Sequence, residues 1–270
     1  MQEANDGIIN VDISEVADFS FCPKYYDYRK NGMRTLMHEY NRALFSVYYK
    51  YLEALKNSST GIKDVYRQLK TNWGISWIKE KTLAEIEVHS INPHLDSYGK
   101  RRRAGALAIE AFGNIMEEPQ YPIAVRAMYS VPIIDHKINL VGIWDYIREI
   151  LVDDEKHIQV VKFEEDVSKM KGGHKHQNSI DIVAMAYAFK KLFNKPFDVI
   201  IIDTNTGSIK GKVTKVNICE EEYKELEQTV VSYIKCIKND IRLISPGIKC
   251  NVCEYREACY PEHFKGGKLI

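Results

Sequence analysis

The chain has 270 residues and nearly balanced charge, with 38 basic against 37 acidic side chains and a formal net charge of +1. This balance argues against a uniformly acidic or basic binding surface, so any nucleic-acid surface must be a local patch. Hydrophobic residues make up 45% of the chain, enough for a sizeable core. No run approaches the roughly 20 apolar residues of a membrane span, and the N-terminus lacks a signal-peptide pattern. We therefore expect a soluble, cytoplasmic protein with no membrane partner.

The first 120 residues have mainly helical patterns. Ser14 is a suitable N-cap for a short helical turn, which Cys22-Pro23 should end. Apolar residues at helical spacing predict a strong helix over residues 40–56. Further helical segments are predicted over 62–73, 75–90 and 102–118.

The pattern then changes to strands rich in Val, Ile and Tyr. We predict strands over 123–134, 137–150 and 157–163, a helix over 179–193, strands over 197–204 and 208–216, and a last helix over 220–243. This order favours one composite α/β domain over residues 1–270. Its parts are a mainly helical insertion (35–120), an α/β core (121–218), and a C-terminal helix with a cysteine-rich segment (219–270).

Six cysteines in an intracellular protein indicate metal or redox chemistry more than disulfides. Cys250 and Cys253 are separated by two residues, so a turn can point both sulfurs to one side, and Cys259 follows six positions later. Cys22 is the natural fourth ligand. Four thiolates suit a [4Fe–4S] cluster or zinc, and the spacing alone does not separate these two. Cys219 and Cys236 are interpreted as ordinary buried thiols.

Two segments carry a resemblance to a known family. The string ISEVADFSFCPKYY, residues 13–26, and the closing CNVCEYREAC, residues 250–259, resemble RecB-like exonucleases. These are PD-(D/E)XK nucleases with an iron–sulfur clasp, among them the CRISPR-associated RecB-like exonucleases. The resemblance implies a restriction-endonuclease-like α/β core sheet with flanking helices, and DNA as the partner. It also implies a [4Fe–4S] cluster held by one early and three late cysteines.

In this family, a strand with Gly-x-x-Asp precedes a strand with (Asp/Glu)-x-Lys, and the two acids hold Mg²⁺ or Mn²⁺. Residues 142–145, Gly-Ile-Trp-Asp, match the first motif, whereas Val160-Val161-Lys162 retains the lysine without the acid. The resemblance therefore predicts Asp145 and Lys162 as catalytic residues. Glu164 is the first choice for a displaced second acid that would hold the metal with Asp145. Glu165 and Asp181 are the alternatives.

Three other positions depart from the family. Arg126 stands where the first strand often has a glutamate, and Asp181 and Met185 replace a Gln-x-x-x-Tyr pair on the following helix. His38 could serve as the histidine that some members carry. Two functions stay open: a metal-dependent DNA nuclease with a relocated acid, or an inactive nuclease fold. The second would bind DNA or serve, with protein partners, as a subunit of a DNA-processing or viral assembly.

Two basic segments are candidates for contacts with a DNA backbone. One is the run at residues 100–103, with Arg101, Arg102 and Arg103, and the other is the loop around Gly172-Gly173, with Lys169, Lys171 and Lys175. The alternative for both is a solvated surface. A third, different function is a zinc-stabilised interaction protein with no nucleic-acid role.

Overall fold

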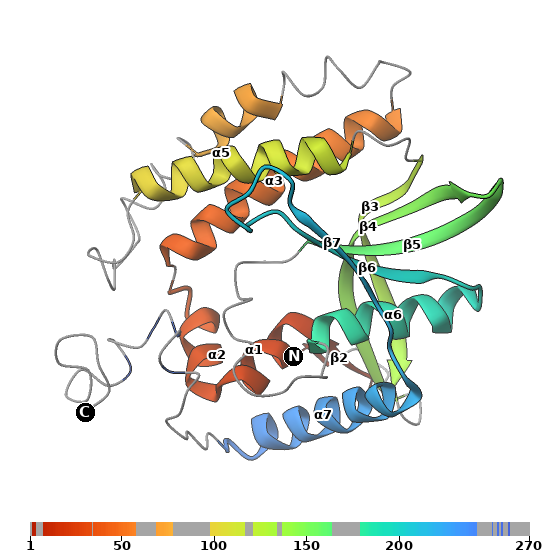
Figure 1. Cartoon of the computed structure of the whole chain (residues 1–270). Coiled ribbons are helices and arrows are strands. Elements are labelled where there is room, and N and C mark those ends of the chain that lie inside the picture. The colour runs from red at the N-terminus through yellow and green to blue at the C-terminus, as the bar shows by residue number, and fades with distance from the viewer. Residues whose placement is uncertain are drawn as a thin grey trace.

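The computed structural model describes residues 2–3, 8–33, 35–57, 69–77, 98–116, 121–133, 137–163 and 179–241, together with Cys250, Cys253, Tyr255 and Cys259. Within these ranges the chain forms an α/β fold, in which a mixed seven-stranded sheet lies between two groups of helices (Figure 1). No helix in the described ranges is long and apolar enough to cross a membrane.

The sheet is built around the long strand β4. Its strand order is β1-β2-β4-β5-β6-β7, and β3 also pairs with β4. Neighbours run antiparallel except for two parallel pairs, β2 with β4 and β5 with β6. The strands are β1 (Gln2–Glu3), β2 (Ile9–Asp12), β3 (Tyr121–Ile133), β4 (Ile138–Val152), β5 (Glu155–Phe163), β6 (Asp198–Asp203) and β7 (Lys212–Val216).

Each face of the sheet has its own hydrophobic core. One core lies under α1 (Ile13–Phe21), α2 (Pro23–Lys30), α6 (Ile180–Phe193) and α7 (Glu220–Lys238). The other lies under α3 (Leu36–Asn57), the helical residues 69–77 and α5 (Tyr98–Ile115). Val160 is buried in the first core and Val161 in the second. Because side chains alternate along a strand, the adjacent residues Val160 and Val161 are both buried only because both faces of β5 are covered.

Periodicity explains why the two longest outer helices cover these cores. The buried residues of α7 recur every three or four positions: Tyr223, Leu226, Val230, Tyr233 and Ile234. Helix α3 follows the same rule over a longer span and buries Leu44, Val47, Tyr48 and Leu52. These helices therefore present one apolar side to the sheet and a polar side to solvent.

Several element boundaries differ from the sequence-based predictions. Asp12, rather than Ser14, caps α1 and accepts a hydrogen bond from the Ser14 N–H at 2.8 Å. Residues 69–77 form one continuous helical stretch where a break near residue 74 was expected. Helix α7 ends at Lys238, five residues early, because the chain turns at Asn239 and at Asp240, whose φ is 53°. Strand β2 was missed because four residues are too short for a periodic signal.

Candidate functional site

The candidate site lies where β4 and β5 stop pairing. Their antiparallel pairing runs from Val152 opposite Glu155 to Tyr146 opposite Val161. One position further, Asp145 takes over part of the ladder: its Oδ2 accepts a hydrogen bond from the Phe163 N–H at 3.0 Å. A carboxylate thus replaces a backbone carbonyl at this point, and its side chain is held within the sheet.

Three charged side chains meet at this point. The Lys162 ammonium lies 3.2 Å from Asp145 Oδ2 and 3.5 Å from Asp181 Oδ2. Asp181 stands in the first turn of α6, where a helix favours an acidic side chain. Tyr49, on α3, donates a hydrogen bond to the other oxygen of Asp145, Oδ1, at 3.0 Å. Asp145 itself is buried, with 7% of its surface exposed. The lysine therefore joins two acids from two different elements.

The structure brings together part of the predicted catalytic set. Asp145 and Lys162 are in contact, and the acid beside them is Asp181. Glu164, the first-choice second acid, and Glu165 lie outside the described residues. Val160, at the motif position that carries an acid in the family, is fully buried in the apolar core. The sequence had identified Asp181 as an alternative, but spacing alone could not rank it above Glu164.

Tyr49 is a site residue that the sequence pattern did not reveal. Burial, followed by the negative charge of Asp145, raises the pKa of the Tyr49 hydroxyl above its ordinary value. The hydroxyl therefore keeps its proton and acts as a donor. Tyr49 is only partly buried and falls outside the apolar spacing of α3, so periodicity did not single it out.

Arg126 lies on β3, directly across from Asp145 on β4. Its neighbours Val125 and Ala127 pair with Tyr146 and Trp144, which places Arg126 opposite Asp145. Its φ is 49°, a left-handed conformation that is uncommon for a residue other than glycine. The guanidinium lies over the ring of Tyr49, 5.1 Å from its centroid. Arg126 therefore stands at the site as a cation.

A steric requirement explains Gly142 of the Gly-x-x-Asp motif. Gly142 pairs with Tyr129 across β3 and β4. A Cβ on Gly142 would lie 2.3 Å from the Tyr129 hydroxyl oxygen and 2.9 Å from Cγ2 of Ile13. The Tyr129 hydroxyl is buried and has no hydrogen-bond partner among the described residues. Burial, then the charge of Asp181, raises the pKa of Tyr129 above its ordinary value.

A metal-binding group is not assembled in the described ranges. These residues contain no set of three or more His, Cys, Asp or Glu side chains placed to hold a metal ion. Among the described residues, Asp145 and Asp181 are the carboxylates in contact with Lys162 at the β4–β5 site. Two carboxylate ligands suit Mg²⁺ or Mn²⁺, which fill their remaining positions with water or phosphate oxygens.

Tyr255, between Cys253 and Cys259 in the sequence, docks on α2, whose N-cap is Cys22. Tyr255 is fully buried, and its ring centroid lies 5.1 Å from those of both Tyr25 and Tyr28. The Tyr255 hydroxyl donates a hydrogen bond to the Met33 carbonyl at 2.7 Å. We call Cys22, α2 and Tyr255 the clasp. The contacts of Tyr255 join residues more than 200 positions apart in the chain.

The four cysteines predicted as ligands do not form a metal-binding group among the described residues. Burial, followed by the charges of Cys22, Cys250 and Cys259, raises the pKa of the Cys253 thiol to about 12. Four thiols fit the donor chemistry of either an iron–sulfur cluster or zinc.

The remaining cysteines differ from each other. The interpretation of Cys219 as a buried thiol is wrong: it is exposed at the N-cap of α7. Its backbone N–H donates a hydrogen bond to Glu222 Oε2 at 2.9 Å. Cys236 is half-buried in the same helix.

His38, at the start of α3, packs against the clasp. Its Nε2 lies 3.3 Å from the Tyr25 hydroxyl and its Nδ1 lies 3.5 Å from the Tyr255 hydroxyl. Burial, and then the positive charge of Arg29, lowers the pKa of His38 to about 3. The imidazole is therefore neutral at physiological pH and packs among tyrosines.

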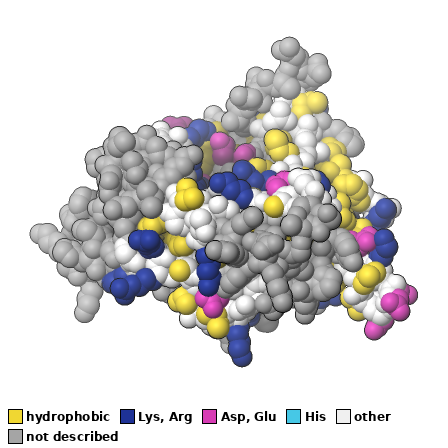
Figure 2. Space-filling view, turned by 90° about the horizontal axis from the view of Figure 1, so that it is seen from above, with side chains coloured by type: hydrophobic (Ala, Val, Ile, Leu, Met, Phe, Trp, Pro, Cys, Tyr) yellow, Lys and Arg dark blue, Asp and Glu magenta, His cyan; other side chains and the backbone are white. Residues whose placement is uncertain are grey.

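The predicted basic contacts are only partly described. Arg101, Arg102 and Arg103 lie in the first turns of α5, and Arg101 stacks over the Tyr40 ring at 5.2 Å. Lys169, Lys171 and Lys175 lie outside the described residues. Figure 2 shows Lys and Arg side chains gathered near the middle of one face, beside acidic ones rather than as a continuous basic surface.

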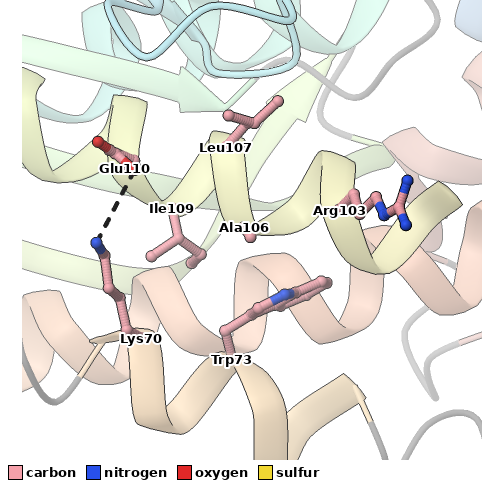
Figure 3. A pocket seen from close by; sticks show the side chains of 7 residues that line it. All are labelled: Lys70, Trp73, Arg103, Ala106, Leu107, Ile109 and Glu110. Carbon is pink, nitrogen blue, oxygen red and sulfur yellow. Dashed lines mark ion pairs between the residues drawn. The ribbon is translucent and has the colours of Figure 1, made fainter. Parts of the chain in front are cut away.

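A separate pocket lies between residues 69–77 and α5. Trp73 lies on one side and Ile109 on the other, and the Lys70–Glu110 ion pair spans it at 3.9 Å (Figure 3). Arg103 also lines this pocket. Its lining includes none of the β4–β5 site residues.

No protein-family model matches this chain, and no curated protein matches it either. Function therefore has to be inferred from the sites themselves.

Proposed function

We propose that the chain is a RecB-like protein of the PD-(D/E)XK type that cleaves DNA with a divalent metal ion. The observation that carries this proposal is the contact of Lys162 with both Asp145 and Asp181. An acid on one strand, a lysine on the next and an acid from the following helix together supply the side chains that such a site needs. The antiparallel β3-β4-β5 unit followed by α6 and the parallel strand β6 agrees with a restriction-endonuclease-like core.

In this proposal Asp181 takes the part of the acid that is missing at Val160. Asp145 and Asp181 would hold Mg²⁺ or Mn²⁺, which when bound supplies an activated water and stabilises charge on the scissile phosphate. Tyr49 and the Phe163 N–H keep the Asp145 carboxylate in place. Lys162 donates hydrogen bonds and positive charge where negative charge develops.

A second candidate is the inactive nuclease fold that binds DNA or a protein assembly. Its supporting observation is the same lysine: the Lys162 ammonium already pairs with both Asp145 and Asp181, where a metal ion would otherwise lie. An apolar Val160, fully buried, also leaves this position without a ligand.

A nuclease assay separates these two functions. The full chain, purified anaerobically, is incubated with labelled single- and double-stranded DNA and Mg²⁺ or Mn²⁺. Asp145→Asn and Asp181→Asn are compared with Asp198→Asn, a control that removes an acid paired with Lys215. We expect cleavage by the wild type and the control, and a loss of at least a hundredfold in both site variants. Cleavage lost only with Asp145→Asn points to Glu164 instead. No cleavage by the wild type favours the inactive fold.

We further propose that the clasp holds a [4Fe–4S] cluster through Cys22, Cys250, Cys253 and Cys259, with zinc as the alternative. The support is the docking of Tyr255 against Tyr25 and Tyr28. Iron, sulfide and zinc analysis, with the visible spectrum, distinguishes the two metals. We expect Cys22→Ser to lose the metal and Cys219→Ser to retain it, because Cys219 caps α7. Equal metal content in both variants would contradict the assignment.

A further inference from the structure

Part of the sheet next to Asp145 is not covered by any of the described helices. Tyr129 and Gly142 pair with each other, and Tyr129 belongs to the core under α1, α6 and α7. Met128 and Ile143, the adjacent pair, must therefore point to the opposite face. On that face α3 and α5 cover Val125 and Tyr146. Met128 is nevertheless 73% exposed and Ile143 is 40% exposed. Two apolar side chains thus face solvent within two positions of Asp145.

Arg126 adds a fixed positive charge to this surface. Its guanidinium is held over Tyr49 and has no carboxylate partner within the described part of the chain. Its left-handed backbone, in the middle of a thirteen-residue strand, is a conformation that glycine would adopt more easily. Stacking on Tyr49 leaves the guanidinium's N–H edge open to an anion, and a planar fork of donors matches a phosphate.

We propose that Arg126, Met128 and Ile143 form a subsite for one nucleotide of single-stranded nucleic acid. Arg126 binds the phosphate, and the Met128–Ile143 pair supports the face of the base. The subsite rests on the proposed function for placing nucleic acid at Asp145. It adds a preference for single-stranded over double-stranded nucleic acid.

Three features favour a single strand as the occupant. An exposed apolar pair can contact only a base that is not stacked in a duplex, whereas a duplex would present its phosphates. The Arg126 guanidinium has no carboxylate partner among the described residues and complements a phosphate, whereas an apolar protein surface would offer it no anion. The strip reaches the β4–β5 site through Arg126, which lies across from Asp145 and stacks on Tyr49, the hydrogen-bond donor to Asp145.

Binding in the absence of metal tests the subsite without depending on cleavage. The probe is fluorescein-labelled oligothymidine, with EDTA present, and the readout is fluorescence anisotropy of the full chain over a range of salt concentrations. We expect Arg126→Ala to raise Kd by roughly tenfold. The slope of log K against log salt should fall by about 0.7, the share of one phosphate contact on a single strand. Lys156→Ala, which removes an exposed charge at the far end of β5, should leave both quantities unchanged.

A second pair of variants separates the base contact from the phosphate contact. Met128→Ser should weaken binding of oligothymidine severalfold but leave an abasic strand of the same length unaffected. Arg126→Ala should weaken both ligands equally. Arg126→Gly relieves the left-handed conformation, so it should melt above Arg126→Ala while binding equally weakly. This variant shows that the loss of affinity is not a loss of folding.

Wild-type affinity in both Arg126→Ala and Met128→Ser would overturn the subsite, and so would equal sensitivity of duplex DNA to Met128→Ser. Arg126-dependent binding by a protein that never cleaves would refute the proposed catalysis and leave the subsite standing. Cleavage that requires Asp145, combined with binding that ignores Arg126, would refute the subsite alone.

Discussion

Replacing Lys162 by methionine tests the electrostatic arrangement of the β4–β5 site. The substitution keeps an unbranched side chain of similar length and removes the ammonium. Asp145 and Asp181 would then lie near each other without the cation that now lies 3.2 Å from one and 3.5 Å from the other. Tyr49 and the Phe163 N–H still hydrogen-bond to Asp145, so the carboxylate is not left without partners.

The expected loss of stability in Lys162→Met follows from the distances of the two ion pairs and from the solvent exposure of their side chains. At an effective dielectric constant of about 20, each contact corresponds to about 5 kcal/mol of Coulomb attraction. Desolvation of the Lys162 side chain, which is only 19% exposed, offsets much of it. Removing one member of a fully buried pair costs about 3–5 kcal/mol, but Asp181 is 32% exposed and therefore screened by solvent. We expect Lys162→Met to lower the free energy of unfolding by about 2–3 kcal/mol.

Urea unfolding in EDTA measures this loss, and Lys215→Met is the matched control. Lys215 lies 2.8 Å from Asp198, closer than Lys162 lies to either acid, but its side chain is 60% exposed. An exposed pair contributes at most about 1 kcal/mol. Mn²⁺ should then stabilise Lys162→Met more than the wild type, because the carboxylates no longer have a competing ammonium. A concentration one hundred times Kd would add about 2.7 kcal/mol.

Two results would refute this reasoning. Equal losses in Lys162→Met and Lys215→Met would mean that burial does not strengthen the site contacts. Equal responses of the wild type and Lys162→Met to Mn²⁺ would mean that the lysine does not occupy a metal position between Asp145 and Asp181.

Three further predictions concern packing and pH. Gly142→Ala should destabilise the chain by about 3 kcal/mol in thermal unfolding, because its Cβ would overlap the Tyr129 hydroxyl; an unchanged melting temperature would contradict this. Gly105→Ala should also destabilise the chain, because its Cβ would lie 1.9 Å from the Trp73 ring. Gly99→Ala is the control in the same helix: there is open space around Gly99, so this variant should be neutral or stabilising by up to about 1 kcal/mol. The folded pKa of His38, about 3, lies below its unfolded value of 6.5, so the unfolded chain binds a proton that the folded chain does not. The free energy of unfolding should therefore fall as pH drops from 6.5 toward 3, by about 1.4 kcal/mol per pH unit from this residue. Urea titrations of His38→Gln should show a weaker dependence of stability on pH. If the wild type and the variant depend on pH equally, His38 is not the cause.

Local patterns in the sequence were enough for the α/β class and for most of the elements. Apolar spacing along α3 and α6, and the β-branched runs of β4 to β6, are properties of short segments, so they can be recognised without the fold. Gly142, Asp145 and Lys162 were singled out by the resemblance to RecB-like exonucleases, because each of the two motifs lies within a single strand and has a fixed spacing. The helical residues 69–77 and the end of α7 were placed less well, since turns there depend on single residues.

Tertiary structure decided which side chains meet. Asp181 lies 19 positions after Lys162 in the chain, and its contact with Lys162 depends on where α6 crosses the end of β5. Tyr49 reaches Asp145 from a helix 96 positions earlier in the chain. Arg126 is brought to the site by the register of β3 against β4 and by its stacking on Tyr49. His38 packs against the clasp because the start of α3 lies beside Tyr255. Periodicity specifies the face on which a residue lies, but the register between strands and the packing of helices specify its neighbours, and these are properties of the whole folded chain.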